Sequence, residues 1–347
     1  MMRGNDSSLA YLWPAVSPFL DTALVPQGHH QWLHRVFNNI PYALPHFLGF
    51  EVRLGAWDGA TDCAISLTPD GARLLASYAA DASQMRANPA WNRLRTFLTL
   101  WANSRQWSFA DATRIWLEFD MGDENLAPNV LFGYRPRTHE AWRTRSWLLD
   151  AAIPALLGAP LPASVRGNIN RVLDACPTSD DLQIGVMCAR PVPVIRLCLF
   201  DLPDTDLPTY LSDVRWNGDA TRLAAFVRDF RPHADFVGLH FDVGEMVYPH
   251  AGVEPGFSAS SWSRQPHREP RWTGQFDVLS KAHLITLQQR AAMLAWPGYQ
   301  RLRISGQDTA VLRGLSHLKV VLRSGGTADA KGYFGVAERA TEVAHGN

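Results

Sequence analysis

Ile115-Trp-Leu-Glu-Phe-Asp-Met-Gly122 and Val237-Gly-Leu-His-Phe-Asp-Val-Gly244 repeat one another 122 residues apart along the chain. Four positions are identical, namely Leu117/Leu239, Phe119/Phe241, Asp120/Asp242 and Gly122/Gly244. Both stretches alternate apolar residues with other residues at a period of two, which indicates a β-strand. Both follow a predicted helix and lead through a turn into a second strand, so the match indicates a chain built from a repeated unit.

Five strand pairs of this kind can be recognised along the sequence. They are Phe50–Leu54 with Cys63–Leu67, Arg114–Met121 with Asn129–Arg135, Leu182–Ala189 with Val194–Leu202, Phe236–Gly244 with Met246–His250, and His317–Arg323 with Ala330–Val336. The segments before and between the pairs have apolar residues at helical spacing. Before the last pair we predict one helix at Val278–Leu294 and a short second one at Asp308–Gly314. The order is therefore helix, helix, strand, strand, repeated about five times.

Composition narrows the class of protein. The chain has 347 residues, 46% of them hydrophobic, which is enough for one large domain. Its formal net charge is zero, which argues against a nucleic-acid partner bound through overall charge. A run of 18 apolar residues and a secretory signal are both missing, and the four cysteines form no CxxC pair. We expect a cytoplasmic protein with reduced thiols and no membrane span.

The faces of the predicted strands indicate how the sheet is arranged. Each strand has one apolar face and one mixed face, which in Arg114–Met121 carries Trp116, Glu118 and Asp120. A closed barrel with helices outside would turn the mixed faces into a shielded chamber, and closure would also remove exposed sheet edges. We therefore predict an α+β fold over residues 1–347 as a single domain. In it, five repeated ααββ units form a ten-stranded antiparallel β-barrel ringed by helices.

From Phe50 to Val336 this organisation resembles the ABBA aromatic prenyltransferases, whose domain is called the PT barrel. The resemblance implies a transferase that moves an allylic prenyl group from its diphosphate to an aromatic or other nucleophilic acceptor, in a peptide or in natural product biosynthesis. It implies Lys, Arg and Tyr side chains around the diphosphate, aromatic shielding of an allyl cation and, in several members, a strand-borne acid as base. Some members of the family need magnesium and others do not, so the resemblance leaves Mg²⁺ open.

The mixed faces contain residues suited to that chemistry. The candidate substrate-binding residues are Arg53, Trp116, Arg196, Lys319, Arg323, Lys331 and Tyr333. Departure of a diphosphate concentrates negative charge on oxygen, so its site needs several cations and hydrogen-bond donors. Trp116, Phe200 and Tyr333 are candidates for stabilising an allyl cation through their ring faces.

Two residues are candidate catalytic groups. Glu118 lies on a mixed face beside Trp116, where a desolvated carboxylate could accept the acceptor's proton. His240 occupies the equivalent position in the repeat and is a second candidate acid or base. No metal ligands are assigned, because HExxH is absent, as are the GxSxG, P-loop and GxGxxG motifs of other enzyme classes.

Each assignment has a structural alternative. Lys319 and Arg323, like Lys331 and Tyr333, are also consistent with solvated or rim positions. Glu118 and Asp120 could pair with Arg53 or Arg114, His240 could be a core histidine, and Asp120 and Asp242 could cap turns. A different class of function is a non-catalytic barrel that binds a hydrophobic or anionic ligand. Such a protein would not need several interior cations if its ligand were neutral.

The longest stretch without a period is Gly252–Gly274, which we predict to be irregular. It contains Trp262 and Trp272 and three arginines. One interpretation is a lid that orders over the chamber when substrate binds and excludes water. The alternative is a surface loop whose tryptophans are packed permanently between helices.

Overall fold

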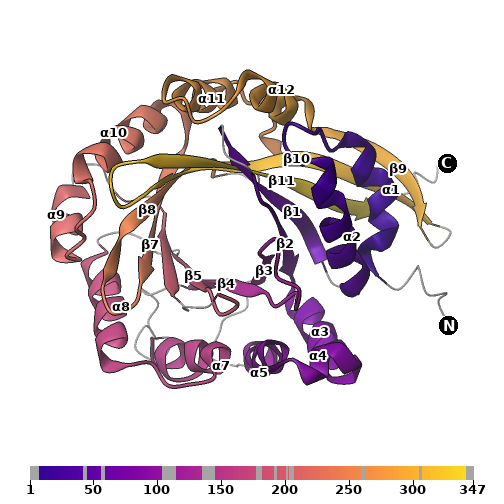
Figure 1. The fold of residues 1–347 in the computed structure, drawn as a ribbon, viewed down its shortest axis with the longest axis horizontal. Coiled ribbons are helices and arrows are strands. Elements are labelled where there is room, and N and C mark those ends of the chain that lie inside the picture. Colours follow the sequence, from indigo (N-terminus) through magenta and orange to yellow (C-terminus); the bar gives the residue numbers. More distant parts are fainter. Residues whose placement is uncertain are drawn as a thin grey trace, which may run out of the picture.

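A closed ring of antiparallel strands forms the centre of the molecule (Figure 1). The structure is a computed structural model that describes residues 8–41, 45–55, 59–103, 115–134, 145–176, 182–190, 194–200, 202, 207–258, 263–304 and 307–340. The ring consists of β1 (Pro45–Leu54), β2 (Thr61–Leu67), β3 (Ile115–Phe119), β4 (Asn129–Tyr134), β5 (Leu182–Val186), β6 (Ile195–Leu199), β7 (Phe236–Val243), β8 (Val247–Gly256), β10 (Gln307–Leu322) and β11 (Ala328–Ala340). Each strand pairs with its neighbours, and β11 returns to β1 to close the barrel. The predicted ten-stranded antiparallel barrel is confirmed.

Helices surround the barrel on the outside (Figure 1). They are α1 (Trp13–Val16), α2 (His30–Asn39), α3 (Pro69–Asp81), α4 (Ser83–Ala87), α5 (Pro89–Asn103), α7 (Ile153–Leu157), α8 (Ala163–Ala175), α9 (Leu207–Asp213), α10 (Ala220–Phe230), α11 (Arg271–Lys281) and α12 (Leu287–Ala295). At least two α-helices precede each hairpin of the ring, with three (α3, α4 and α5) before β3 and with β9 inserted between α12 and β10, so the repeat of helices followed by two strands is also present. Among the described residues, every helix is too short or too polar to cross a membrane.

The period-two pattern explains how strands and helices pack. The outward residues Ile115, Leu117 and Phe119 of β3 are buried beneath the helices. Phe119 lies 6.5 Å from Trp91 of α5, measured between ring centroids, and Phe37 of α2 stacks on Phe50 of β1. Burial of this outer face supplies the hydrophobic stabilisation, while the residues between them point into the barrel.

Two predictions of local structure are wrong. Asp308–Gly314 is part of β10, not a helix, because it pairs with β11 on one side and with β9 (Gly298–Ile304) on the other. The pairing with β9, a strand that the sequence did not reveal, extends the sheet beyond the ring (Figure 1). Val278–Leu294 is not one helix but parts of α11 and α12, with His283 between them at a φ of 57°.

The stretch predicted to be irregular is regular at both ends. Gly252–Gly256 belongs to β8, and α11 begins at Arg271, while Trp262 lies outside the described residues. Trp272 is 1% exposed and packs against Phe257 and Phe276. Its Nε1 donates a hydrogen bond to the carbonyl oxygen of Arg264 at 2.5 Å. For Trp272, the structure therefore agrees with the packing alternative.

Removing the Trp272 side chain should destabilise the protein. Trp272→Ala leaves a cavity between β8 and α11 and is expected to lower the free energy of unfolding by about 3–5 kcal/mol, measured by urea denaturation. Leu287→Ala is the matched control, since Leu287 is 80% exposed on the neighbouring α12 and its loss should change stability by less than about 0.5 kcal/mol. Equal effects of the two changes would contradict this packing role.

Candidate active site

Two adjoining cavities occupy the inside of the barrel. The aromatic chamber, about 200 Å³, is lined by Phe47, Gly49, Phe50, Glu51, Asp62, Cys63, Ala64, Trp116, Glu118, Asp120, Leu131, Gln183, Arg196, His240, Glu254, Ser316, His317, Lys319, Tyr333 and Phe334. The charged chamber, about 490 Å³, is lined by Arg53, Ala60, Asp62, Asp120, Met121, Arg190, Val194, Arg196, His240, Asp242, His250, Ala251, Gly252, Lys319, Val321, Arg323 and Lys331. Residues common to both linings, among them Arg196 and Lys319, show that the chambers meet inside the barrel.

The predicted cations converge on the charged chamber. Arg53, Arg196, Lys319 and Lys331 all line it, although they come from four different strands. Lys331 on β11 lies opposite both Arg53 on β1 and Lys319 on β10, so these three form a row across adjacent strands. The row exists because the barrel is closed, since β1 and β11 are far apart in sequence.

The Glu51 carboxylate accepts hydrogen bonds from several side chains of the lumen. Glu51 accepts hydrogen bonds from Lys331 Nζ at 2.5 Å, from the Tyr333 hydroxyl at 2.5 Å and from Arg53. Arg53 also contacts Asp62 Oδ2 at 3.0 Å. We call these five residues the Glu51 cluster. Two cations and two carboxylates therefore share one buried region of the lumen.

Burial and the neighbouring charges shift the pKa values of the Glu51 cluster, in part in opposite directions. Burial alone would raise the pKa of Glu51, but Lys331 and Arg53 outweigh it and hold that pKa well below its ordinary value. Burial, with the negative charge of Glu51 adding to it, raises the pKa of Asp62 to about 7. Burial lowers the pKa of Lys331 to about 8 despite the nearby Glu51. Near neutral pH the cluster is therefore close to taking up or releasing a proton.

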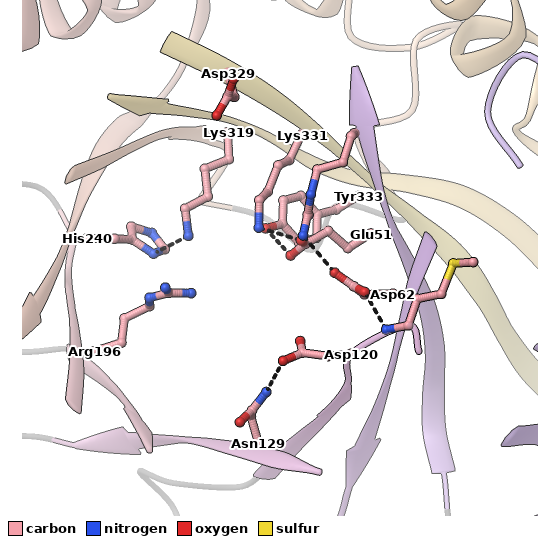
Figure 2. A network of polar contacts seen from close by, with 12 residues as sticks. Glu51, Asp62, Asp120, Asn129, Arg196, His240, Lys319, Asp329, Lys331 and Tyr333 are labelled. Atoms are coloured by element: carbon pink, nitrogen blue, oxygen red, sulfur yellow. Dashed lines mark hydrogen bonds and ion pairs between the residues drawn. The ribbon is translucent and has the colours of Figure 1, made fainter. Parts of the chain in front are cut away.

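Lys319 of β10 points toward His240 of β7, a strand that is separated from β10 by β8 (Figure 2). Its Nζ lies 2.8 Å from His240 Nδ1, and His240 Nε2 lies 2.9 Å from Glu254 Oε2. Gly252 makes this path possible, because a Cβ there would lie 2.6 Å from Lys319 Cε. Burial lowers the pKa of His240 well below its ordinary value and the charge of Lys319 lowers it further, so the ring is neutral.

The remaining cations are paired with acids. Arg196 donates to both oxygens of Asp242, at 2.7 and 3.0 Å, and His250 Nε2 also contacts Asp242 at 2.9 Å. Asp120 contacts Arg190 at 3.1 Å and accepts a hydrogen bond from Asn129. Arg323 lies at the edge of the charged chamber, where it is 43% exposed and pairs with Asp329. It is thus the most peripheral of the predicted binding residues.

Glu118 and Lys319 differ from this pattern of pairing. Among the described residues, the Glu118 carboxylate has no hydrogen bond or ion pair, and Lys319 has no ion pair with a carboxylate. Burial raises the pKa of Glu118, and the charge of Glu51 raises it further. Glu118 lies two residues from Trp116, whose ring meets Phe47 edge to face at 5.3 Å. The aromatic chamber therefore presents one open carboxylate beside aromatic rings.

The candidate site includes residues that the sequence analysis missed. Glu51 lies on the same face of its strand as Arg53, so alternation could have found it, whereas Glu254 was hidden in the stretch predicted to be irregular. His317 was also missed, and its ring stacks on Tyr333 at 4.0 Å. Phe200 contacts His240 edge to face but does not line either chamber. Asp120 and Asp242 form ion pairs instead of the predicted turn caps.

The carboxylates present do not fit a dedicated metal site. Among the described residues, no group of three or more His, Cys, Asp or Glu side chains is arranged to hold a metal ion. Asp62 and Asp120, which line both chambers, are already bonded to Arg53 and to Arg190. We assign no chemical step to a metal ion.

Comparison with known proteins identifies the fold. No protein-family model and no curated protein sequence matches the chain. The prenyltransferase PriB, in a ternary complex with L-tryptophan and dimethylallyl thiolodiphosphate, matches with a TM-score of 0.55 at 13% identity, over 94% of this chain and 96% of PriB. The 5-dimethylallyltryptophan synthase from Streptomyces coelicolor matches with a TM-score of 0.54 at 12% identity, over 94% of this chain and 97% of the synthase. The chain therefore has the ABBA fold seen in these prenyltransferases.

Titration of Glu254 should make stability depend on pH. Burial raises the pKa of Glu254 from 4.5 to about 7, so within that window the folded protein retains a proton that the unfolded chain has released. The free energy of unfolding should therefore fall as pH rises from 4.5 to 7. In Glu254→Gln the side chain at this position cannot titrate. Across this pH range the free energy of unfolding of the parent should therefore fall by up to about 3 kcal/mol relative to that of the variant, measured by urea denaturation.

The matched control for this test is Glu124→Gln, which changes an exposed glutamate in the turn after β3. Its stability profile should run parallel to that of the parent. Parallel profiles for the parent and Glu254→Gln would contradict the assignment of a raised pKa to Glu254.

Proposed function

We propose that the protein transfers an allylic prenyl group from its diphosphate to an aromatic acceptor. One observation carries the proposal: Arg53, Arg196, Lys319 and Lys331 line one chamber, which opens into an aromatic chamber containing an unpaired carboxylate. The fold is that of PriB, which was crystallised with L-tryptophan and a dimethylallyl thiolodiphosphate, so an aromatic acceptor and an allylic donor are consistent with the barrel. This is an enzymatic function of the transferase class.

The two chambers suggest how the reactants would be divided. Lys319, Lys331 and Arg53 of the charged chamber would hold the diphosphate together with Tyr333 of the adjoining aromatic chamber, because these residues supply charged and neutral hydrogen-bond donors. The allylic chain and the acceptor would lie toward Trp116, Phe47 and Phe334 in the aromatic chamber. Arg196 and His240 line both chambers and would lie where the two reactants meet.

The proposed reaction has three steps. The allylic carbon–oxygen bond breaks and the diphosphate leaves with the electron pair, while the lumen cations stabilise its added charge. A carbon of the aromatic acceptor attacks the allyl cation, whose charge is shielded by the ring faces of Trp116 and Tyr333. Glu118 then removes the proton from the alkylated ring, which restores its aromaticity. Exclusion of water by the barrel wall protects the cation during the transfer.

Calorimetric titration of an allylic diphosphate analogue tests the binding part of the proposal. Lys319→Ala and Lys331→Ala should each weaken binding by about 1.5–3 kcal/mol, because each removes one charged hydrogen bond to the anion. Lys281→Ala is the control, since Lys281 is exposed at the end of α11 outside the barrel. Unchanged affinity in both lumen variants would exclude a diphosphate site here.

Turnover of dimethylallyl diphosphate with a panel of indoles and phenols tests the chemistry. Glu118→Gln keeps the shape of the side chain but removes its basicity, so turnover should fall about 10²–10⁴-fold with less effect on acceptor binding. A Glu118→Gln variant with the parent rate would remove Glu118 from the mechanism and favour His240.

The same assay separates the enzyme from a binding protein. A non-catalytic barrel would bind the donor but release no diphosphate with any acceptor. Assays with added Mg²⁺ and with a chelator would show whether the diphosphate requires a metal ion for turnover.

A further inference from the structure

Glu51 occupies the donors that the proposed function assigns to the diphosphate. We propose that Glu51 is an internal ligand of this site, which the incoming diphosphate must displace, and that the displacement is accompanied by uptake of a proton. The inference rests on the proposed function, because it concerns the same cations. It adds a competing group and a coupled proton, neither of which prenyl transfer itself requires.

The geometry makes the two occupants exclusive. The Glu51 carboxylate receives Lys331 Nζ on Oε1 and the Tyr333 hydroxyl on Oε2, both at 2.5 Å, and Arg53 also donates to Oε1. Lys331 has three N–H donors, but the Tyr333 hydroxyl has a single hydrogen, which Glu51 Oε2 receives, so a phosphate oxygen that takes this hydrogen must stand where the carboxylate now stands. Binding at this place therefore exchanges one anion for another and does not fill a vacant set of cations.

Neighbouring charge explains why a proton should accompany the exchange. Glu51 and Asp62 are directly opposite residues on β1 and β2, and both contact Arg53. Within the Glu51 cluster two carboxylates balance two cations, and all of these side chains are largely buried. Adding a polyanion would leave a buried excess of negative charge, which protonation of one carboxyl relieves. The raised pKa of Asp62 is consistent with this.

Glu51 also has a plain benefit in the empty barrel. Two cations without a counter-ion would be costly to bury, and Glu51 supplies that counter-ion until a substrate arrives. The consequence is a weaker apparent affinity, since only molecules in which Glu51 has moved away can bind the anion.

Titration calorimetry with inorganic pyrophosphate tests the inference on the whole protein. Glu51→Gln removes the competing charge, so it should bind pyrophosphate at least about tenfold more tightly than the parent. Titrations in two buffers of different ionisation enthalpy give the number of protons taken up. The parent should take up more protons than Glu51→Gln when pyrophosphate binds. The difference in affinity between the parent and Glu51→Gln should become smaller as pH falls, because the carboxyl that must be protonated on binding is then already protonated in more of the molecules.

Glu118→Gln is the matched control, because it removes a carboxylate from the same lumen, and Lys331 and Tyr333 donate their hydrogen bonds to Glu51 and not to Glu118. Its affinity for pyrophosphate should rise less than that of Glu51→Gln. An equal rise in affinity in the two variants would mean that the overall charge of the lumen, and not the occupation of these donors by Glu51, sets the affinity. That result would overturn the inference.

If Glu51→Gln does not fold, Glu51→Asp carries the test. The shorter carboxylate of this variant holds Lys331 and Tyr333 less well, so the variant should bind pyrophosphate more tightly than the parent and should still take up a proton.

The outcomes separate this inference from the proposed function. If the parent binds pyrophosphate and Lys331→Ala weakens binding, but Glu51→Gln binds no more tightly, only the role of Glu51 is wrong. If neither the parent nor Glu51→Gln binds pyrophosphate between pH 5.5 and 8, both the diphosphate site and its internal ligand are wrong. Binding by Glu51→Gln alone would support both.

Discussion

The pairing of β1 with β11 is the contact on which the rest of the structure depends. It joins the first and last strands of the ring and places Arg53 opposite Lys331 and Glu51 opposite Tyr333. The closed ring removes free sheet edges and gives every strand an inner face that is shielded by the whole barrel. The buried charges of the lumen are therefore a consequence of long-range pairing and not of any local motif.

Burial of so many charged groups is tolerated because acids and bases are matched. Arg53 and Lys331 face Glu51 and Asp62, Arg196 faces Asp242, and Arg190 faces Asp120. In such pairs, Coulomb attraction and hydrogen bonds replace the hydration that is lost on burial. Removing one partner leaves the other as an unpaired buried charge, which is strongly destabilising. An anion that binds among these cations would therefore compete with the carboxylates. Lys319 and Glu118, which lack an opposite charge among the described residues, are the groups best able to form new contacts.

The sequence predicted the barrel because alternation is a local signal that repeats in five hairpins. It failed at Asp308–Gly314, where a short apolar run is compatible with helix or strand and pairing with β9 and β11 decides the outcome. The inward direction of Lys319 followed from alternation, but its contact with His240, 79 residues away, had no sequence signal. Glu254 escaped notice because Pro255 and nearby glycines made the end of β8 look irregular. The acids of the lumen were thus harder to predict than its cations.

The most direct test of the proposed diphosphate site is a structure of the protein bound to a non-hydrolysable allylic thiolodiphosphate. We expect the two phosphates inside the barrel, within hydrogen-bonding distance of Lys319, Lys331 and Arg53, with the allylic chain beside Trp116. We also expect the Glu51 carboxylate to have left Lys331 and Tyr333. Phosphates bound outside the barrel, or a Glu51 cluster that stays intact while the ligand is bound elsewhere, would contradict a diphosphate site at Lys319, Lys331 and Arg53.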